Sequence, residues 1–316
     1  HHYRLKNKSG EVFGGPMIYM ERGLNMKWLG AVFAFCLLVS TFGSGNMPQI
    51  DNISSTIESS FGLNPLYTSL VMSILVGSVV IGGIKRIGQT TEKIVPLMVV
   101  LYVSASLFII ITNFEKLPNV LNEILSQAFS PNAAYGGFIG VLVTGVKRAV
   151  FSNEGGVGSA SIAHSAAKTD EPVREGIVAM VGPFIDTIIV CFMTASVILI
   201  TSEANPLYKV GGGINGAELT SAAFGTTISW FPYVLSVVVF LFSFSTMISW
   251  YYYGDKGWKY LFGDSTIKIY QTMYLSAVVL GSISSLGHVI DFSDMMILSC
   301  AFPNIIGCLF LLPLLR

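Results

Sequence analysis

Long apolar runs without charged residues occupy most of this chain of 316 residues. A bilayer core of about 30 Å requires about 20 apolar residues in helical form, so runs of this length can cross a membrane. The composition agrees, because 52% of the residues are hydrophobic and 11% are charged, whereas soluble domains carry about 25% charged residues. The runs therefore predict an all-α fold, a polytopic membrane helix bundle that forms one domain over residues 1–316.

Eight membrane spans follow from these runs, and the fourth is expected to be broken near residues 152–158. The spans are predicted at residues 28–50, 66–84, 94–114, 137–167, 176–202, 231–254, 269–290 and 295–315. Lysine and arginine accumulate in cytoplasmic loops, and 14 of the 18 basic residues fall in alternate connections, against two in the others. Both ends of the chain are therefore expected on the cytoplasmic side of the cytoplasmic (inner) membrane. Because 18 acidic residues balance the 18 basic ones, no nucleic-acid partner is expected.

The most informative motif is the glycine-rich stretch SNEGGVGSA at residues 152–160. Three glycines within four residues weaken a helix by up to ~1 kcal/mol each, and the polar residues before them are costly to place against lipid. Unwound backbone at membrane depth is tolerated only where it is buried or lines a cavity. Its free N–H and C=O groups suit a carboxylate and a cation. The stretch therefore predicts a substrate site that contains Ser152, Asn153, Glu154, Gly155, Gly156 and Gly158.

Close helix packing is the alternative interpretation of this stretch. Gly155, Ser159 and Ala163 recur four residues apart, and small residues at that spacing let helices approach one another. The adjoining polar residues, Ser152 to Glu154, favour a site over packing alone.

Other polar residues lie inside the predicted spans. Asp186 falls near mid-membrane, where an ionisable group is a functional candidate, although a hydroxyl or basic partner would make it structural.

Asn46 and Gln49 are three residues apart, with Pro48 expected to kink the helix between them. If the first span continues to about residue 60, Gln49 can bind substrate; otherwise both side chains are solvated at the outer boundary.

Lys147 and Arg148 lie inside a predicted span, so they must snorkel, face a vestibule or pair with an acid. Their functional interpretation is an outer gate.

The central motif, with Ile162, Ala163 and His164 after it, resembles the signature of the alanine or glycine:cation symporter family, the sodium:alanine symporters. Further matches are GGPM at 14–17, GGIKRI at 82–87, FST at 244–246 and PN at 303–304. The resemblance implies the LeuT-like fold of the amino-acid/polyamine/organocation superfamily, with two inverted repeats of five helices. The eight spans then correspond to the third to tenth core helices, so the resemblance implies a LeuT-like fold that lacks the first two core helices.

The resemblance also implies function: sodium-coupled symport of a small neutral amino acid, alanine or glycine. Na⁺ is then the coupling ion, with no other cofactor, and the bilayer is the surrounding medium. By resemblance, Ser245 and Thr246 look like sodium ligands, Thr246 also like a substrate ligand, and Trp250 like a pocket wall. Hydroxyl oxygens suit hard cations. The alternatives are that the hydroxyls bond their own helix and that Trp250 anchors the chain at the membrane interface.

Two other classes of function are alternatives to symport. A channel-like or non-transporting membrane protein of the same fold is the main alternative. An intramembrane enzyme needs a nucleophile within reach of a base, but Ser159 and His164 are five residues apart on one helix, which is poor geometry for contact. No catalytic residue is therefore predicted.

Overall fold

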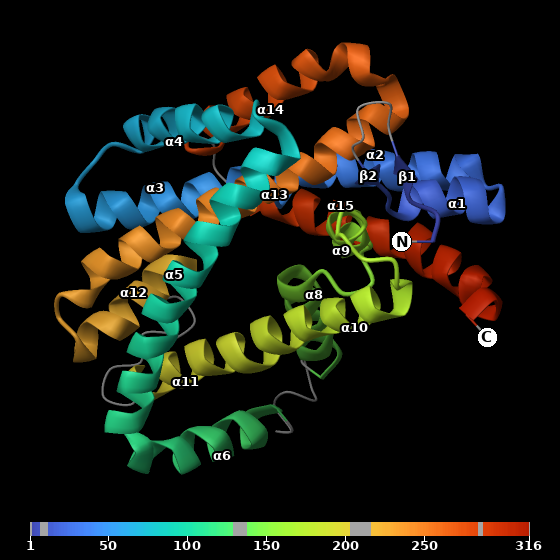
Figure 1. Cartoon of the computed structure of the whole chain (residues 1–316). Helices are drawn as coiled ribbons and strands as arrows, with labels where there is room; N and C mark the ends of the chain where they lie inside the picture. The colour runs from blue at the N-terminus through green and yellow to red at the C-terminus, as the bar shows by residue number, and fades with distance from the viewer. Residues whose placement is uncertain (1, 7–11, 129–137, 203–215, 284–286, 316) are drawn as a thin grey trace.

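The computed structural model describes residues 2–6, 12–128, 138–202, 216–283 and 287–315, which form a helical bundle with one short antiparallel hairpin (Figure 1). The first half contains β1 (Leu5–Lys6), β2 (Val12–Phe13), α1 (Pro16–Leu24), α2 (Lys27–Gly43), α3 (Met47–Phe61), α4 (Pro65–Val80), α5 (Gly83–Thr112), η1 (Phe114–Lys116), α6 (Leu117–Ala128) and α8 (Phe138–Asn153). The second half contains α9 (Ser159–His164), α10 (Pro172–Pro183), the π-helical segment η2 (Phe184–Val190), α11 (Cys191–Ser202), α12 (Gly216–Thr227), α13 (Phe231–Phe262), η3 (Asp264–Thr266), α14 (Ile267–Gly281), α15 (Gly287–Leu311) and η4 (Leu312–Leu315).

Five segments within the described residues are long and apolar enough to cross a membrane. They are Lys27–Phe61, which joins α2 and α3, Gly83–Thr112, Pro172–Ser202, Phe231–Phe262 and Asp291–Leu311. These elements confirm the predicted helical membrane bundle.

Three of the eight predicted spans correspond to shorter helices, so the count of eight stays a prediction. α4 has 16 residues, about 24 Å at 1.5 Å per residue, and α14 has 15. The predicted span at 137–167 is divided between α8 and α9. Other helices are longer than predicted: α5 begins at Gly83 and α13 ends at Phe262. Charged residues end an apolar run, but they do not end a helix.

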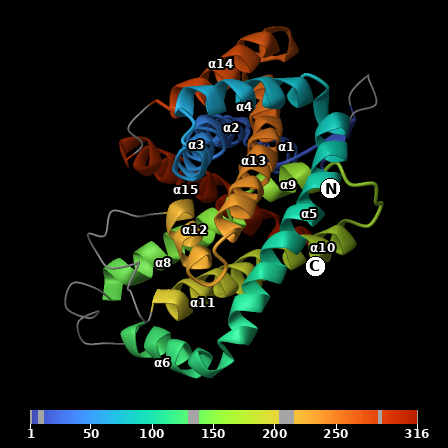
Figure 2. The ribbon, with the colours of Figure 1, turned by 90° about the vertical axis from the view of Figure 1, so that its left-hand side faces the viewer.

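Two groups of helices meet along α13 (Figures 1 and 2). One buried cluster includes Phe33 of α2, Met72 of α4 and Tyr274 of α14. The other includes Ile109 of α5 and Phe224 of α12. Since α13 supplies buried side chains to both clusters, a residue on this helix is held by both parts of the bundle.

Large apolar side chains are exposed on the outer faces of several helices. Ile74 of α4 is 72% exposed, Met180 of α10 is 73% exposed and Phe302 of α15 is 74% exposed. Extended apolar surface of this kind marks contact with another protein or with lipid. Met180 and Phe302 lie in segments long enough to span a bilayer, where such surface is suited to acyl chains.

Among the described residues, two helical interruptions are central to the site and its packing. One lies at residues 44–46, between α2 and α3, and the other at residues 154–158, between α8 and α9. The first interruption differs from the predicted kink, because Pro48 sits in the first turn of α3. A proline there removes no helical hydrogen bond, so the interruption precedes the proline and is made by residues 44–46.

Candidate functional site

The break between α8 and α9 lies where the glycine-rich motif predicts it. Glu154, Gly156 and Gly158 have φ angles of 54°, 77° and 98°, in the left-handed region where glycine meets no Cβ penalty. A Cβ added at Gly158 would lie 2.7 Å from Asn304 Oδ1 and 2.7 Å from Pro16 Cγ. The chain therefore needs glycine at residue 158 for both conformation and space.

Part of the freed backbone is already bonded within the motif. The amide of Gly155 donates to Asn153 Oδ1 at 2.7 Å, and the amide of Val157 donates to the Glu154 carbonyl at 3.1 Å. Within the described residues, the amides of Gly156 and Gly158 donate to no protein acceptor. These two N–H groups are the ones left to receive an external acceptor.

Glu154, the first residue of the break, reaches the opposite helix. Its carboxylate accepts a hydrogen bond from the Ser159 hydroxyl, and Glu154 lines the same cavity as Trp250. Ser159 begins α9, and Trp250 lies in the middle of α13. Glu154 therefore bonds across the break to the start of α9 and lies at the cavity wall formed by α13.

A cavity of about 220 Å³ lies at this junction. Its lining contains four of the predicted site residues, Glu154, Ser245, Thr246 and Trp250, together with Thr91, Val95, Ser249 and Tyr253. Glu154, just after α8, precedes the three α13 residues by at least 91 positions in sequence, yet the fold brings all four to the wall of one cavity.

The two predicted cation ligands on α13 use their protons within their own helix. The hydroxyls of Ser245 and Thr246 both donate to the Phe242 carbonyl, at 2.8 and 3.0 Å. This is the alternative considered from the sequence, but it does not exclude ligation, because a hydroxyl that donates its proton keeps its oxygen lone pairs. Both residues line the cavity, so the donor set of oxygen atoms fits a hard cation.

A larger cavity, of about 380 Å³, lies along the other side of the break. It is lined by Asn153, Gly155, Gly156 and Gly158 of the motif, and Glu154 borders both cavities. The amides of Gly156 and Gly158, which have no protein acceptor among the described residues, therefore belong to residues that line this cavity, while Gly158 also packs against Asn304 and Pro16.

Asn304 of α15 holds the break in place and was not predicted as a site residue. Its Nδ2 donates to the Gly156 carbonyl at 2.7 Å, and its Oδ1 accepts from the Tyr19 hydroxyl of α1. Burial raises the pKa of Tyr19 well above its ordinary value, so this hydroxyl stays protonated. The PN pair was noted only as a family match, and a single asparagine in an apolar helix could not be connected to the break from sequence.

The remaining polar residues of the motif contact the π-helical segment η2. Ser152 donates to the Asp186 carboxylate, and Asn153 Nδ2 donates to Thr187 Oγ1 at 3.0 Å. Asp186 thus has a hydroxyl partner, as the structural interpretation of this residue requires. The contact holds the end of α8 next to η2. Asp186 lines neither of the two cavities at the break.

Gln49 and Asn46 lie at the other interruption and do not line the cavities at the break. Gln49 Nε2 donates to the Ser44 carbonyl at 3.3 Å, and Asn46 Nδ2 donates to the Tyr274 carbonyl at 2.9 Å. Asn46 is fully buried, so it is not solvated at an outer boundary. The proposed contact of Gln49 with substrate stays a prediction that the observed hydrogen bond does not favour.

Lys147 and Arg148 pair with an acid, which was one of the three possibilities raised by the sequence. Lys147 Nζ lies 2.8 Å from Asp294 Oδ2, and Arg148 contacts the same oxygen. Asp294 is 1% exposed and lies in α15. The predicted last span began one residue after Asp294, so this partner was missed; a carboxylate beside an apolar run is the signal that could have revealed it.

These features define a class of protein. A membrane helix bundle in which a discontinuous helix presents unpaired amides, a carboxylate and hydroxyl oxygens beside small cavities is the arrangement of a secondary transporter. The sodium:alanine symporter family matches residues 1–316, and the chain belongs to this family. Family membership confirms the predicted multi-pass membrane transporter rather than an enzyme.

Individual relatives agree with this assignment. The chain is 39% identical to the sodium/alanine symporter AgcS of Methanococcus maripaludis, over 98% of this chain and 69% of the relative. It is 40% identical to an uncharacterized transporter of Haemophilus influenzae, over 96% of this chain and 68% of the relative. It is 35% identical to the probable sodium/glutamine symporter GlnT of Bacillus subtilis, over 96% of this chain and 63% of the relative. The chain thus spans about two thirds of the length of these relatives.

Proposed function

We propose that this chain contributes the broken-helix half of the substrate and ion site in a sodium-coupled symporter for a small neutral amino acid, alanine or glycine. The observation that carries the proposal is the meeting of Glu154 with Ser245, Thr246 and Trp250 at one cavity. Membership of the sodium:alanine symporter family, and similarity to a relative named as a sodium/alanine symporter, support the ion and the substrate class.

The backbone of the break receives the substrate carboxylate. The amides of Gly156 and Gly158 have no acceptor among the described residues and border the larger cavity. Two N–H donors aimed at one carboxylate give charge-assisted hydrogen bonds, which are about twice as strong as neutral ones. The left-handed conformations of Gly156 and Gly158 keep their amides out of the i→i−4 hydrogen bonds of a helix, so both are available before the substrate binds.

Glu154 connects the substrate to the ion. It borders both cavities, so its carboxylate can face the substrate ammonium on one side and Na⁺, held by the Ser245 and Thr246 oxygens, on the other. Each cation then binds more tightly when the other has ordered this carboxylate, and such coupling is reciprocal. Na⁺ that favours the outward-facing state shifts the protein toward the state that accepts substrate.

The proposed setting is the cytoplasmic membrane with both ends of this segment in the cytoplasm, as the distribution of lysine and arginine predicts. An inward sodium gradient then drives uptake. Lys147 and Arg148, paired with Asp294, act as an outer gate in this scheme, because separating α8 from α15 breaks both pairs.

Uptake by the complete protein in proteoliposomes tests the proposal. An inward Na⁺ gradient, compared with an equal choline gradient, is expected to accumulate labelled alanine above the external concentration. Unlabelled glycine is expected to compete, and glutamine, suggested by the name of one relative, is expected to compete weakly. Sodium conductance without concentrative uptake would instead establish the channel-like alternative.

A further inference from the structure

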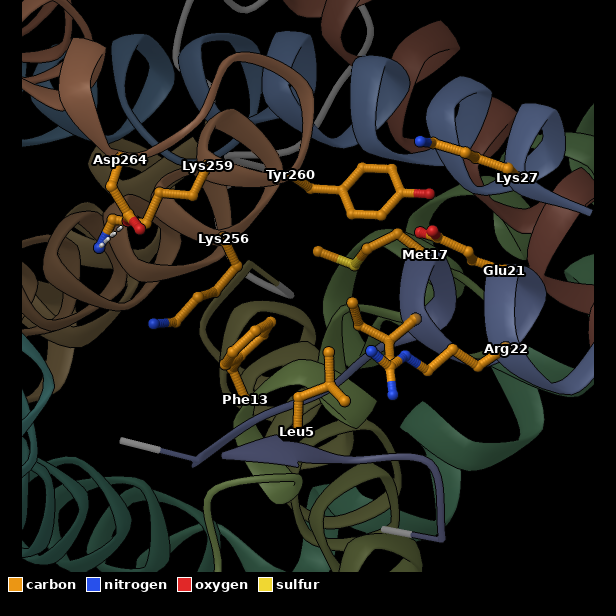
Figure 3. A pocket seen from close by; sticks show the side chains of 11 residues that line it. Leu5, Phe13, Met17, Glu21, Arg22, Lys27, Lys256, Lys259, Tyr260 and Asp264 are labelled. Carbon is orange, nitrogen blue, oxygen red and sulfur yellow. Dashed lines mark ion pairs between the residues drawn. The ribbon is translucent and has the colours of Figure 1, made fainter. Parts of the chain in front are cut away.

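The N-terminal hairpin is too small to hold its own position. β1 and β2 have two residues each and pair in antiparallel register, with Leu5 opposite Phe13, and an isolated hairpin is at best marginally stable in water. Leu5, Phe13 and Lys256 of α13 line one cavity of about 330 Å³ (Figure 3). Lys256 Nζ lies 5.8 Å from the centroid of the Phe13 ring, within the range of a cation–π contact. Contacts with the helices therefore position the hairpin.

Arg4, the residue before β1, bonds a different part of the molecule. Its Nη1 donates to the Ala167 carbonyl at 2.9 Å, and its Nη2 donates to the Thr169 carbonyl at 3.0 Å. Both carbonyls belong to the α9–α10 connector, residues 165–171. The guanidinium is a planar fork of N–H donors, so it bonds two carbonyls at once. Arg4 thereby ties the hairpin to the connector.

The two glycines after β2 bring the chain close to the same region. A Cβ added at Gly14 would lie 2.8 Å from Ser165 Cβ, and one added at Gly15 would lie 2.6 Å from Ile162 Cγ1. Cβ atoms essentially never approach other heavy atoms that closely, so both positions need glycine. Ile162 lies in α9, and Ser165 begins the connector. These contacts give the GGPM motif at residues 14–17 a physical role, which is to seat the N-terminal segment against α9.

The connector borders the larger cavity at the break. Residues from both of its ends line that cavity: His164 at the end of α9, and Pro172 and Glu175 at the start of α10. His164 Nδ1 and Glu175 Oε1 lie 2.6 Å apart. At the other end of α9, the Ser159 hydroxyl donates to the Glu154 carboxylate. A displacement of α9 therefore changes both the lining of this cavity and the contact of Glu154.

The distribution of basic residues predicts that the hairpin and the connector both face the cytoplasm. Lys6 lies in the hairpin, whereas Lys168 and Arg174 lie in and just after the connector, and lysine and arginine are enriched in cytoplasmic loops. The contacts of Arg4 are thus expected on the side where an uptake system releases its substrate.

We propose that Arg4 and the hairpin form a latch that holds α9 in place and so disfavours opening of the larger cavity toward the cytoplasm. This role rests on the proposed transport function. Arg4 is a positioning residue, because it acts through α9 and lines neither cavity at the break. During release, the connector leaves the two guanidinium donors, α9 moves away from the glycines, and the cavity opens. Since the latch bonds exist only before opening, they shift the population between the two states.

Accessibility of α9 from the two faces of the membrane tests the latch. Ala160→Cys places a cysteine on the lining of the larger cavity, in the complete protein with its four native cysteines replaced by alanine. Reaction with a membrane-impermeant maleimide is measured in inside-out and right-side-out vesicles. Arg4→Gln removes the charged fork and is expected to raise the labelling rate from the cytoplasmic face about tenfold and to lower it from the external face. A loss of structure would instead raise both rates.

Matched variants separate the latch from a general charge effect. Lys6→Gln removes the same charge from an exposed position on the same hairpin and is expected to leave both rates unchanged. Gly14→Ala changes the contact without removing Arg4, since the added methyl meets Ser165, and it is expected to raise cytoplasmic labelling. Ser165→Gly, added to Gly14→Ala, is expected to restore the original rate.

Alanine uptake by the complete protein, measured in parallel, tests the proposed function separately, because labelling requires no transport. Unchanged cytoplasmic labelling in Arg4→Gln, or an equal rise in Lys6→Gln, would overturn the latch. If Arg4→Gln is labelled faster from both faces, Gly14→Ala decides: a cytoplasmic rise that Ser165→Gly reverses supports the latch, and any other result overturns it.

Discussion

The two helical interruptions of this bundle differ in what their freed backbone contacts. Between α2 and α3, the Gly45 carbonyl accepts from the Tyr274 hydroxyl at 3.2 Å, and the Ser44 carbonyl accepts from Gln49. A Cβ added at Gly45 would lie 2.3 Å from Trp250 Cβ. This interruption is filled by protein, and its residues serve packing.

Between α8 and α9, Gly156 and Gly158 instead line the larger cavity, Glu154 lines both cavities, and three residues adopt the left-handed conformation. Asn304 donates a hydrogen bond to the Gly156 carbonyl of this break. The amides of Gly156 and Gly158 have no protein acceptor among the described residues. An interrupted helix therefore indicates a binding site only where its backbone faces open space. The comparison predicts that changes at the α8–α9 break alter transport, whereas changes at the α2–α3 interruption alter stability.

Glu154→Gln is expected to give the largest effect. It keeps the side-chain shape but removes the charge shared between ammonium and Na⁺, and hydrogen bonds to charged groups contribute about 1.5–3 kcal/mol. Sodium-dependent alanine uptake in proteoliposomes should fall about tenfold to a hundredfold, with little change in melting temperature. Unchanged uptake would remove Glu154 from the site.

Gly45→Ala is expected to act on stability. The added methyl meets Trp250, and overpacking of this kind costs about 1–3 kcal/mol. Thermal unfolding measures the effect. Gly145→Ala in α8 is the control, because a Cβ there meets no atom within 4 Å; it should leave the melting temperature unchanged or raise it. Equal behaviour of the two variants would contradict the packing role of residues 44–46.

Asn304→Asp is expected to weaken substrate binding. The change is nearly isosteric, but it replaces the donor to the Gly156 carbonyl with an acceptor, so the break loses its anchor on α15. The alanine concentration for half-maximal uptake should rise about tenfold, equivalent to about 1.4 kcal/mol. Tyr19→Phe, which removes only the donor to Asn304, should have a smaller effect in the same assay. An effect on expression alone would limit Asn304 to packing.

Ser245→Ala and Thr246→Val are expected to change the response to sodium. Each removes one oxygen ligand from the wall of the smaller cavity while preserving most of the side-chain volume. The half-saturating Na⁺ concentration should rise about threefold to tenfold, on the scale of one neutral hydrogen bond. Titration of uptake rate against Na⁺ at fixed alanine measures this shift. A shift confined to the alanine titration would place these residues on the substrate instead.

Gln49→Leu is expected to have the smallest effect on transport. Gln49 bonds the Ser44 carbonyl, in the interruption that is filled by protein. Uptake kinetics should change less than about twofold, since an exchange of one such weak bond costs about 0.5 kcal/mol. A large rise in the half-saturating alanine concentration would instead support the substrate contact that the sequence suggested.

The local chemistry of the broken helix was readable from sequence, because consecutive glycines after a polar triplet cannot form a stable membrane helix. The family resemblance pointed to Ser245, Thr246 and Trp250, and the fold places these residues opposite Glu154. Asn304 and Asp294 could not be assigned from sequence, since their roles depend on partners far away in the chain: Gly156 lies 148 positions before Asn304, and Lys147 lies 147 positions before Asp294. Gln49 is a different case: its contact with substrate stays a prediction, and the fold supplies its side chain with a backbone partner, the Ser44 carbonyl.

Hydrogen–deuterium exchange of the complete protein tests the central claim most directly, because it reports on the peptide amides of the break. The amides of Gly156 and Gly158 are expected to exchange rapidly in the free protein and to slow when alanine and Na⁺ are added together, while residues 44–46 stay unchanged. Exchange at Gly156 and Gly158 that is slow from the start, or that ignores alanine and Na⁺, would contradict a binding role for this backbone.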